Sequence, residues 1–157
     1  MNRKGIILSG GLGTRLFPAT ISISKQIIPV YDKPMIYYSL STLMQAGIRE
    51  ILIISSPEHI NFFKKLFNDG SHLGIRINYM IQEKPEGIAQ SFLIAEDFIG
   101  DSSVSLILGD NIFFSSSLDE KLEEISKTDV SSIFAFHVKE PSAFGVVEFD
   151  KKFRAIG

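Results

Sequence analysis

The 157-residue chain is long enough for one domain with a hydrophobic core, and 45% hydrophobic and 22% charged residues are typical of globular proteins. A formal net charge of −2 leaves no basic surplus for binding nucleic acid or a membrane surface. Cysteine is absent, which excludes disulfides and thiolate metal sites. Because no signal peptide or membrane-length apolar run is recognisable either, we expect a cytoplasmic protein.

Short apolar runs bounded by turn residues alternate with segments whose apolar residues recur at helical spacing. Such runs are typical of strands covered on both faces, whereas residues 75–81 alternate like a strand with one wetter face. In chain order, the pattern predicts a strand at 5–8, a helix at 36–44, a strand at 51–54, a helix at 60–67, a strand at 75–81, a helix at 88–99, a strand at 104–108, a helix at 118–125 and a strand at 133–138. Ser117 with Glu120 three residues later forms a capping-box pattern before the last helix.

The strand–helix alternation predicts an α/β fold, with a mostly parallel sheet between helices on both faces. Ligands of such sheets bind beyond the carboxyl ends of the strands. This rule selects three loops, at residues 9–15, 82–87 and 109–111.

The last part of the sequence has the pattern of a β-hairpin. Residues 144–149 predict a strand, Lys151 and Lys152 a turn, and residues 153–157 the start of a partner strand. We therefore expect residues 1–157 to form a single nucleotide-binding domain that is cut off within a larger transferase domain.

A glycine-rich loop follows the first predicted strand. Gly10, Gly11 and Gly13 allow backbone amides to approach an anion closely, and Thr14 and Arg15 add a hydroxyl and a planar cation suited to phosphate oxygens. A tight turn after a buried strand is the structural alternative. No Gly-Lys-Ser/Thr follows, so the loop is not a P-loop, and the third glycine position of a dinucleotide fingerprint is Leu16.

Residues 10–16 (Gly-Gly-Leu-Gly-Thr-Arg-Leu), followed by Ser24, Lys25, Gln26 and Pro29, resemble the signature of the sugar nucleotidyltransferases. Residues 23–38 and 40–55 resemble the thymidylyl branch of that family, and the resemblance extends through residue 150. It implies a Rossmann-like three-layer fold. It also implies a reaction in which glucose 1-phosphate attacks the α-phosphorus of dTTP in line, giving dTDP-glucose and pyrophosphate for dTDP-rhamnose or another deoxysugar.

The resemblance also implies roles for individual residues. The amides of residues 10–14 would hold the triphosphate, Arg15 would contact its outer phosphates, and Lys25 would meet charge developing at the α-phosphate. The nucleotide-binding residues that it implies are Leu8, Gly10, Gly11, Gly13, Thr14, Arg15, Lys25, Gln26, Gln82, Gly87 and Asp110.

Three further roles concern the base, the metal and the sugar. Gln82 would read the base, since an amide offers both a donor and an acceptor, and Gly87 would allow close backbone approach. Asp110, directly after a buried strand, would ligate Mg²⁺. Gly145 would contact the sugar. The structural alternatives are solvated surface cations, an exposed glutamine and a turn-capping aspartate.

The same residues leave three alternatives to a complete thymidylyl-transferring enzyme. The family's second metal-binding aspartate and its Glu-Glu-Lys-Pro motif do not occur within residues 1–157, so this chain could bind nucleotide without turnover. A UTP- or CTP-using relative would keep the same phosphate site, and an NAD-dependent oxidoreductase is disfavoured by the missing glycine.

The family is typically oligomeric, which implies a homo-oligomer at full length. Ser9, Phe17, Ser39 and Phe144 depart from common family residues, which leaves fine specificity open.

Overall fold

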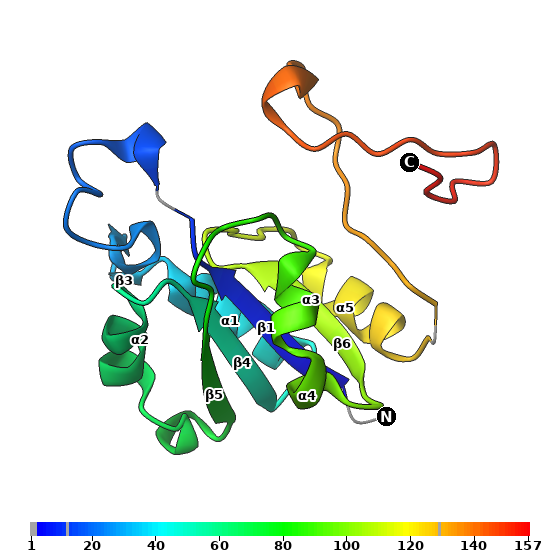
Figure 1. Ribbon diagram of the computed structural model, residues 1–157. Helices are drawn as coiled ribbons and strands as arrows, with labels where there is room; N and C mark the ends of the chain where they lie inside the picture. Colours follow the sequence, from blue (N-terminus) through cyan, green and yellow to red (C-terminus); the bar gives the residue numbers. More distant parts are fainter. Residues whose placement is uncertain (1–2, 12, 129) are drawn as a thin grey trace.

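The computed structural model describes residues 3–11, 13–128 and 130–157 (Figure 1). Its strands are β1 (Arg3–Ser9), β2 (Pro29–Val30), β3 (Lys33–Pro34), β4 (Glu50–Ser55), β5 (Arg76–Ile81) and β6 (Ser103–Leu108). Its α-helices are α1 (Ile36–Gln45), α2 (Ile60–Phe67), α3 (Gln90–Ile94), α4 (Glu96–Ile99) and α5 (Leu118–Ser126). Short 3₁₀ turns lie at Thr14–Leu16, Lys25–Ile27, Ser71–Leu73 and Pro141–Ala143.

The main sheet has four parallel strands in the order β5-β4-β1-β6. Gly5 of β1 lies opposite Ile51 of β4 and Ser105 of β6, so the three strands run in step. All four carboxyl ends therefore meet at one edge of the sheet. A separate antiparallel pair, β2 and β3, precedes α1.

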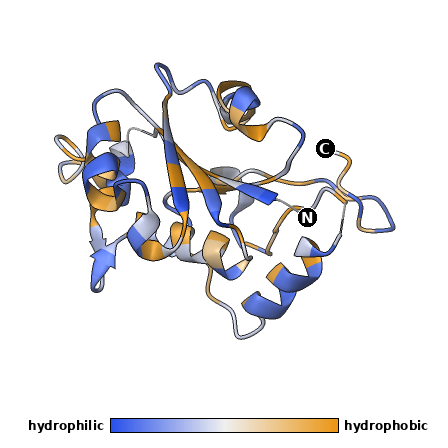
Figure 2. Ribbon diagram, turned by 90° about the horizontal axis from the view of Figure 1, so that it is seen from below, coloured by the Kyte–Doolittle hydropathy of each residue, from blue (hydrophilic) through white to orange (hydrophobic). Residues whose placement is uncertain are grey.

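Helices cover both faces of the sheet. On one face, α1 and α2 pack against Ile7, Ile51 and Ile53, with Phe63 and Phe67 fully buried. On the other face, residues of α3 and α4 pack against the alternate strand positions, Ile6, Leu52 and Ile54. Successive strand side chains point to opposite faces, so strands buried on both faces need apolar residues at nearly every position. Figure 2 shows apolar colour over the middle of the strands and hydrophilic colour at strand ends. The predicted three-layer α/β fold is confirmed.

The last strand prediction is wrong. Residues 131–138, all of which the structure describes, form no strand and lie mostly exposed after α5. Figure 1 shows this segment leaving the sheet. The sheet order ends at β6, and residues 131–138 do not pair with that edge strand. A strand-like composition alone does not form a strand.

Three smaller predictions are partly confirmed. The chain end turns as predicted, with an isolated bridge between Phe149 and Ala155, but residues 144–149 form no complete strand. The helix at 88–99 divides into α3 and α4 at the buried Ala95. Ser117 precedes α5, but in the described part of the chain its side chain makes no capping bond. None of the described helices is both long enough and apolar enough to cross a membrane.

Candidate functional site

A cavity of about 250 Å³ lies at the carboxyl edge of the sheet. It is lined by Leu8, Gly10, Gly11, Gln26, Gln82, Pro85, Gly87, Ile88, Leu108 and Asp110. The three loops selected by the strand-end rule therefore meet around one hollow. Seven of the residues implied by the sequence signature line it: Leu8, Gly10, Gly11, Gln26, Gln82, Gly87 and Asp110.

The glycine-rich loop forms one wall of this cavity. A Cβ atom on Gly10 would collide with Oε1 of Gln82, so any larger residue at position 10 would force the Gln82 side chain to move. Gly13 has a φ of +62°, and its carbonyl accepts a 2.8 Å hydrogen bond from Oγ1 of Thr20. These contacts fix both ends of the loop. Leu12, whose amide belongs to the predicted phosphate cradle, lies outside the described residues.

Thr14 and Arg15 begin the 3₁₀ turn that follows this loop. Both side chains are exposed, and neither residue is among the described ones that line the cavity. Within the described residues, Arg15 makes no ion pair. Its guanidinium is therefore exposed and open to a ligand.

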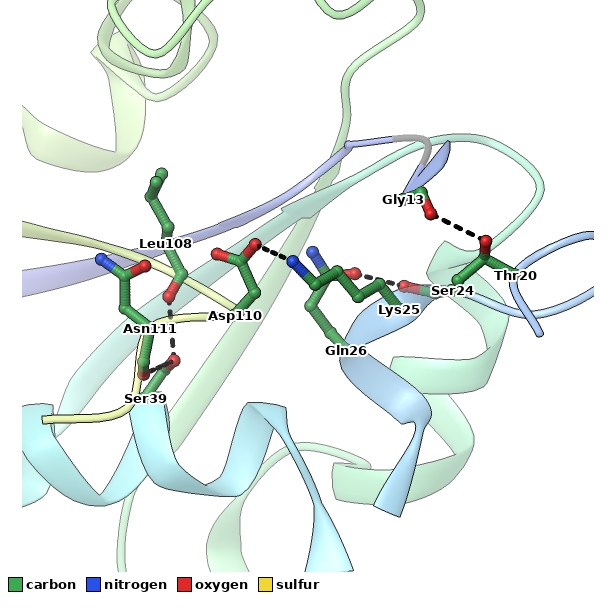
Figure 3. A network of polar contacts seen from close by, with 9 residues as sticks. All are labelled: Gly13, Thr20, Ser24, Lys25, Gln26, Ser39, Leu108, Asp110 and Asn111. Carbon is green, nitrogen blue, oxygen red and sulfur yellow. Dashed lines mark hydrogen bonds and ion pairs between the residues drawn. The ribbon is translucent and has the colours of Figure 1, made fainter. Parts of the chain in front are cut away.

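Lys25 and Asp110 form an ion pair beside the cavity (Figure 3). Nζ of Lys25 lies 2.8 Å from Oδ2 of Asp110, and the two side chains are 30% and 28% exposed. The next residue, Gln26, is only 4% exposed, and its Oε1 accepts a 2.5 Å hydrogen bond from Oγ of Ser24. A cation, a carboxylate and an amide thus meet where β1 and β6 end.

The loop that carries Asp110 is held by its neighbours. Oγ of Ser39 on α1 lies 2.9 and 3.0 Å from the carbonyl oxygens of Leu108 and Asn111, which flank Asp110 (Figure 3). Its single hydrogen is shared between these two acceptors. The backbone N–H of Gly109 donates to the carbonyl of Leu8 at 2.9 Å. No local sequence pattern predicts this role of Ser39, because its partners are 69 and 72 positions away.

Gln82 lines the cavity from the end of β5 and is 3% exposed. Its backbone N–H donates to the carbonyl of Ser55 at 2.8 Å, and its Nε2 donates to Oε1 of Gln90 at 2.6 Å. Gln90 also contacts Glu86 through both ends of its amide. The sequence analysis missed Gln90, which stands in the first turn of α3 and has no motif of its own.

The structure does not bring Gly145 into this group. Gly145 lies exposed in the segment after α5, and the described residues that line the cavity do not include it. Asp110 is the one carboxylate among those lining residues. In the described part of the chain, no group of three His, Cys, Asp or Glu side chains is arranged to hold a metal ion.

A larger hollow of about 940 Å³ lies at the opposite edge of the sheet. It is lined by Arg3, Ala46, Gly47, Ile48, Arg49, Glu50, Ser71, Gly74, Ile75, Arg76, Ser126 and Lys127. None of these residues is among the binding or catalytic residues that the resemblance implies, and parallel α/β sheets bind ligands at the carboxyl edge. The smaller cavity is therefore the candidate site.

The sequence pattern of nucleotidyl transferases matches residues 4–157. The chain belongs to the nucleotidyl transferase family. Glucose-1-phosphate thymidylyltransferase of Neisseria gonorrhoeae is 55% identical over 154 residues, which make up 98% of this chain and 54% of that protein. The chain thus spans about half the length of the curated relatives that it matches.

Solved structures of nucleotidyl transferases share the fold. A candidate glucose-1-phosphate thymidylyltransferase from Bacillus anthracis, in complex with sucrose, aligns with a TM-score of 0.74 and 38% identity, over 81% of this chain and 51% of that one. A UDP-glucose pyrophosphorylase complexed with UDP-glucose aligns with a TM-score of 0.68 and 25% identity, over 80% of this chain and 52% of that one.

Proposed function

We propose that the protein to which this chain belongs is a glucose-1-phosphate thymidylyltransferase, and that this chain carries its nucleotide site. The observation that supports this most strongly is the convergence of Gly10, Gln82 and Asp110 on one cavity, with Lys25 paired to Asp110 at its edge. The 55% identity to an enzyme of that name adds support.

The reaction would require placement and charge neutralisation rather than a covalent intermediate. An oxygen of glucose 1-phosphate would form a bond to the α-phosphorus of dTTP, and the bond from that phosphorus to the pyrophosphate oxygen would break. Backbone amides of the glycine-rich loop and the exposed Arg15 would hold the outer phosphates. Lys25 would stabilise the charge that develops at the α-phosphate.

We propose Mg²⁺ as the metal of this site. It takes hard oxygen ligands, usually one or two carboxylates together with phosphate oxygens. Asp110 is the carboxylate at the cavity, and its ion-pair partner Lys25 would bind phosphate in this proposal. The metal would neutralise phosphate charge, and Asp110 would hold it beside the cavity.

Base recognition would use the part of the cavity that is formed by the segment after β5. Gln82 offers an amide beside Gly87 and the apolar side chains of Pro85 and Ile88. A buried amide that pairs with a base discriminates strongly, because a wrong base leaves it unpaired. UTP use is the second candidate, and the structural likeness to a UDP-glucose-bound pyrophosphorylase favours it over other bases.

Turnover by this chain alone is a separate question. The chain spans about half of its relatives, and Gly145, the residue predicted to contact the sugar, is not among the described lining residues. We therefore propose nucleotide binding by this chain and catalysis by the longer protein. We further propose that the longer protein supplies dTDP-glucose for deoxysugar synthesis. We also propose that it is cytoplasmic and forms a homo-oligomer.

Two assays separate binding from turnover. Calorimetric titration of the chain with dTTP and Mg²⁺ should give saturable binding, which Arg15→Ala weakens at least about 10-fold through the loss of a phosphate contact. Arg76→Ala, an exposed arginine at the other sheet edge, is the matched control and should bind like the wild type. Pyrophosphate release from dTTP and glucose 1-phosphate then reports turnover. A folded chain that binds no nucleotide would contradict the proposed site.

A further inference from the structure

We propose that Gln90 is a positioning residue that fixes which way round the Gln82 amide is presented, and so selects bases with a protonated N3. This rests on the proposed function, in which Gln82 contacts the base. It adds a residue outside the signature, and it assigns that residue a direction of hydrogen bonding.

The orientation of the Gln90 amide is set by two groups that each have one possible role. The backbone N–H of Glu86 can only donate, and it lies 3.1 Å from Oε1 of Gln90. The carboxylate of Glu86 can only accept when ionised, and its Oε2 lies 3.0 Å from Nε2 of Gln90. A flipped Gln90 would lose both bonds.

The orientation of Gln82 follows from that of Gln90. Because Gln90 presents its oxygen, Gln82 must present its NH₂ group, and the two atoms are 2.6 Å apart. Oε1 of Gln82 then faces Gly10, which leaves no room for a Cβ atom there. One acceptor and the second hydrogen of Nε2 remain for a ligand.

This arrangement matches one class of base. Thymine and uracil carry a donor at N3 with a carbonyl acceptor beside it, whereas cytosine has an acceptor at N3 beside an amino donor. A Gln82 amide that could rotate freely would serve either class by flipping. Locked by Gln90, it favours thymine and uracil, and cytosine would leave buried polar groups unpaired.

The test compares dTTP, dUTP and dCTP, which share their sugar and phosphates. Calorimetric titrations with Mg²⁺ would give the ratio of dCTP to dTTP dissociation constants for each variant. Gln90→Leu removes the acceptor, so we expect this ratio to fall by about 10- to 100-fold, mainly through tighter dCTP binding. The double variant Gln90→Glu with Glu86→Gln keeps an acceptor at 90 and a donor at 86, and should restore the ratio.

The outcomes separate the two proposals. A wild-type chain that prefers dTTP, together with an unchanged ratio in Gln90→Leu, would overturn the role of Gln90 and leave the nucleotide site standing. Equal binding of the three nucleotides by the wild type would overturn base reading by Gln82.

A readout without nucleotide tests the orientation itself. The side-chain NH₂ protons of Gln82 should exchange slowly in the wild type, quickly in Gln90→Leu and slowly again in the double variant, as measured by ¹⁵N-resolved hydrogen exchange. Fast exchange in the wild type would contradict the proposal even if no nucleotide bound.

Discussion

Nζ of Lys25 lies 2.8 Å from Oδ2 of Asp110, although the two residues are 85 positions apart in the chain. The ion pair joins the 3₁₀ turn Lys25–Ile27 to the loop after β6. Each side chain is about 30% exposed, so the pair contributes little to folding, on the order of 0–1 kcal/mol. We infer that the ion pair serves to place the two side chains, since it holds the proposed phosphate-binding cation beside the proposed metal-binding carboxylate.

Asp110→Asn should therefore separate ligand binding from stability. The urea midpoint should change little, because the pair is partly exposed. The increase in dTTP affinity on adding Mg²⁺ should be lost, while metal-free binding is kept or strengthened by removal of a negative charge. Asp97→Asn, on the exposed side of α4, is the matched control. An undiminished Mg²⁺ effect in Asp110→Asn would rule out the metal role.

Gly10→Ala should disrupt the site, since the added Cβ would collide with Oε1 of Gln82. Overpacking of this kind typically costs about 1–3 kcal/mol. In Gly11→Ala the new Cβ would meet no described atom within 4 Å, apart from its chain neighbours, so this variant should keep wild-type stability. Urea unfolding of the two variants checks the contrast. Equal destabilisation would show that the collision is not the cause.

Ser9→Ala should stabilise the protein. In the described part of the chain, Oγ of Ser9 is buried and has no hydrogen-bond partner. Removing an unsatisfied buried hydroxyl recovers a desolvation cost of about 1–3 kcal/mol. The free energy of unfolding in urea should rise accordingly, and a fall would mean that this hydroxyl is already bonded in solution.

The sequence predicts the sheet well because its two central strands, β1 and β4, are buried on both faces. Ile6 and Ile7, or Ile53 and Ile54, are adjacent apolar residues that pack against different helix layers, and the resulting runs are easy to recognise. The glycine-rich loop and the two strand-end loops were located for the same reason. Their convergence on one cavity follows from the parallel order of the strands.

Features that depend on partners distant in sequence cannot be predicted from apolar runs or local motifs. Residues 133–138 have a strand-like composition, yet they do not join the sheet, which ends at β6. Whether a segment pairs depends on its tertiary contacts and not on its composition alone. The clamp formed by Ser39 and the network of Gln90 with Gln82 and Glu86 are visible only once side chains meet in space. Such roles carry no local pattern.

Tyr79 should make the folded state sensitive to alkali. Burial, with a smaller effect of Asp69, raises the pKa of Tyr79 to about 12. The unfolded phenol ionises near pH 10, so this contribution to stability is complete below pH 10 and is lost as pH rises toward 12. Tyr79→Phe removes the bond to the Asn68 carbonyl and should cost about 0.5–1.5 kcal/mol at neutral pH. The difference between wild type and variant should shrink between pH 9 and pH 11.5 in urea unfolding. A constant difference would contradict the shift.

The central claim is that nucleotide binds at the carboxyl edge of the sheet, and its most direct test is amide chemical-shift mapping of the ¹⁵N-labelled chain titrated with dTTP and Mg²⁺. We expect the largest shifts at Gly10, Gly11, Gly13, Thr14, Arg15, Lys25, Gln82, Gly87 and Asp110. Residues around the larger hollow, such as Gly47, Gly74 and Arg76, should not move. Shifts confined to that second group, or no shifts at millimolar dTTP, would contradict the account.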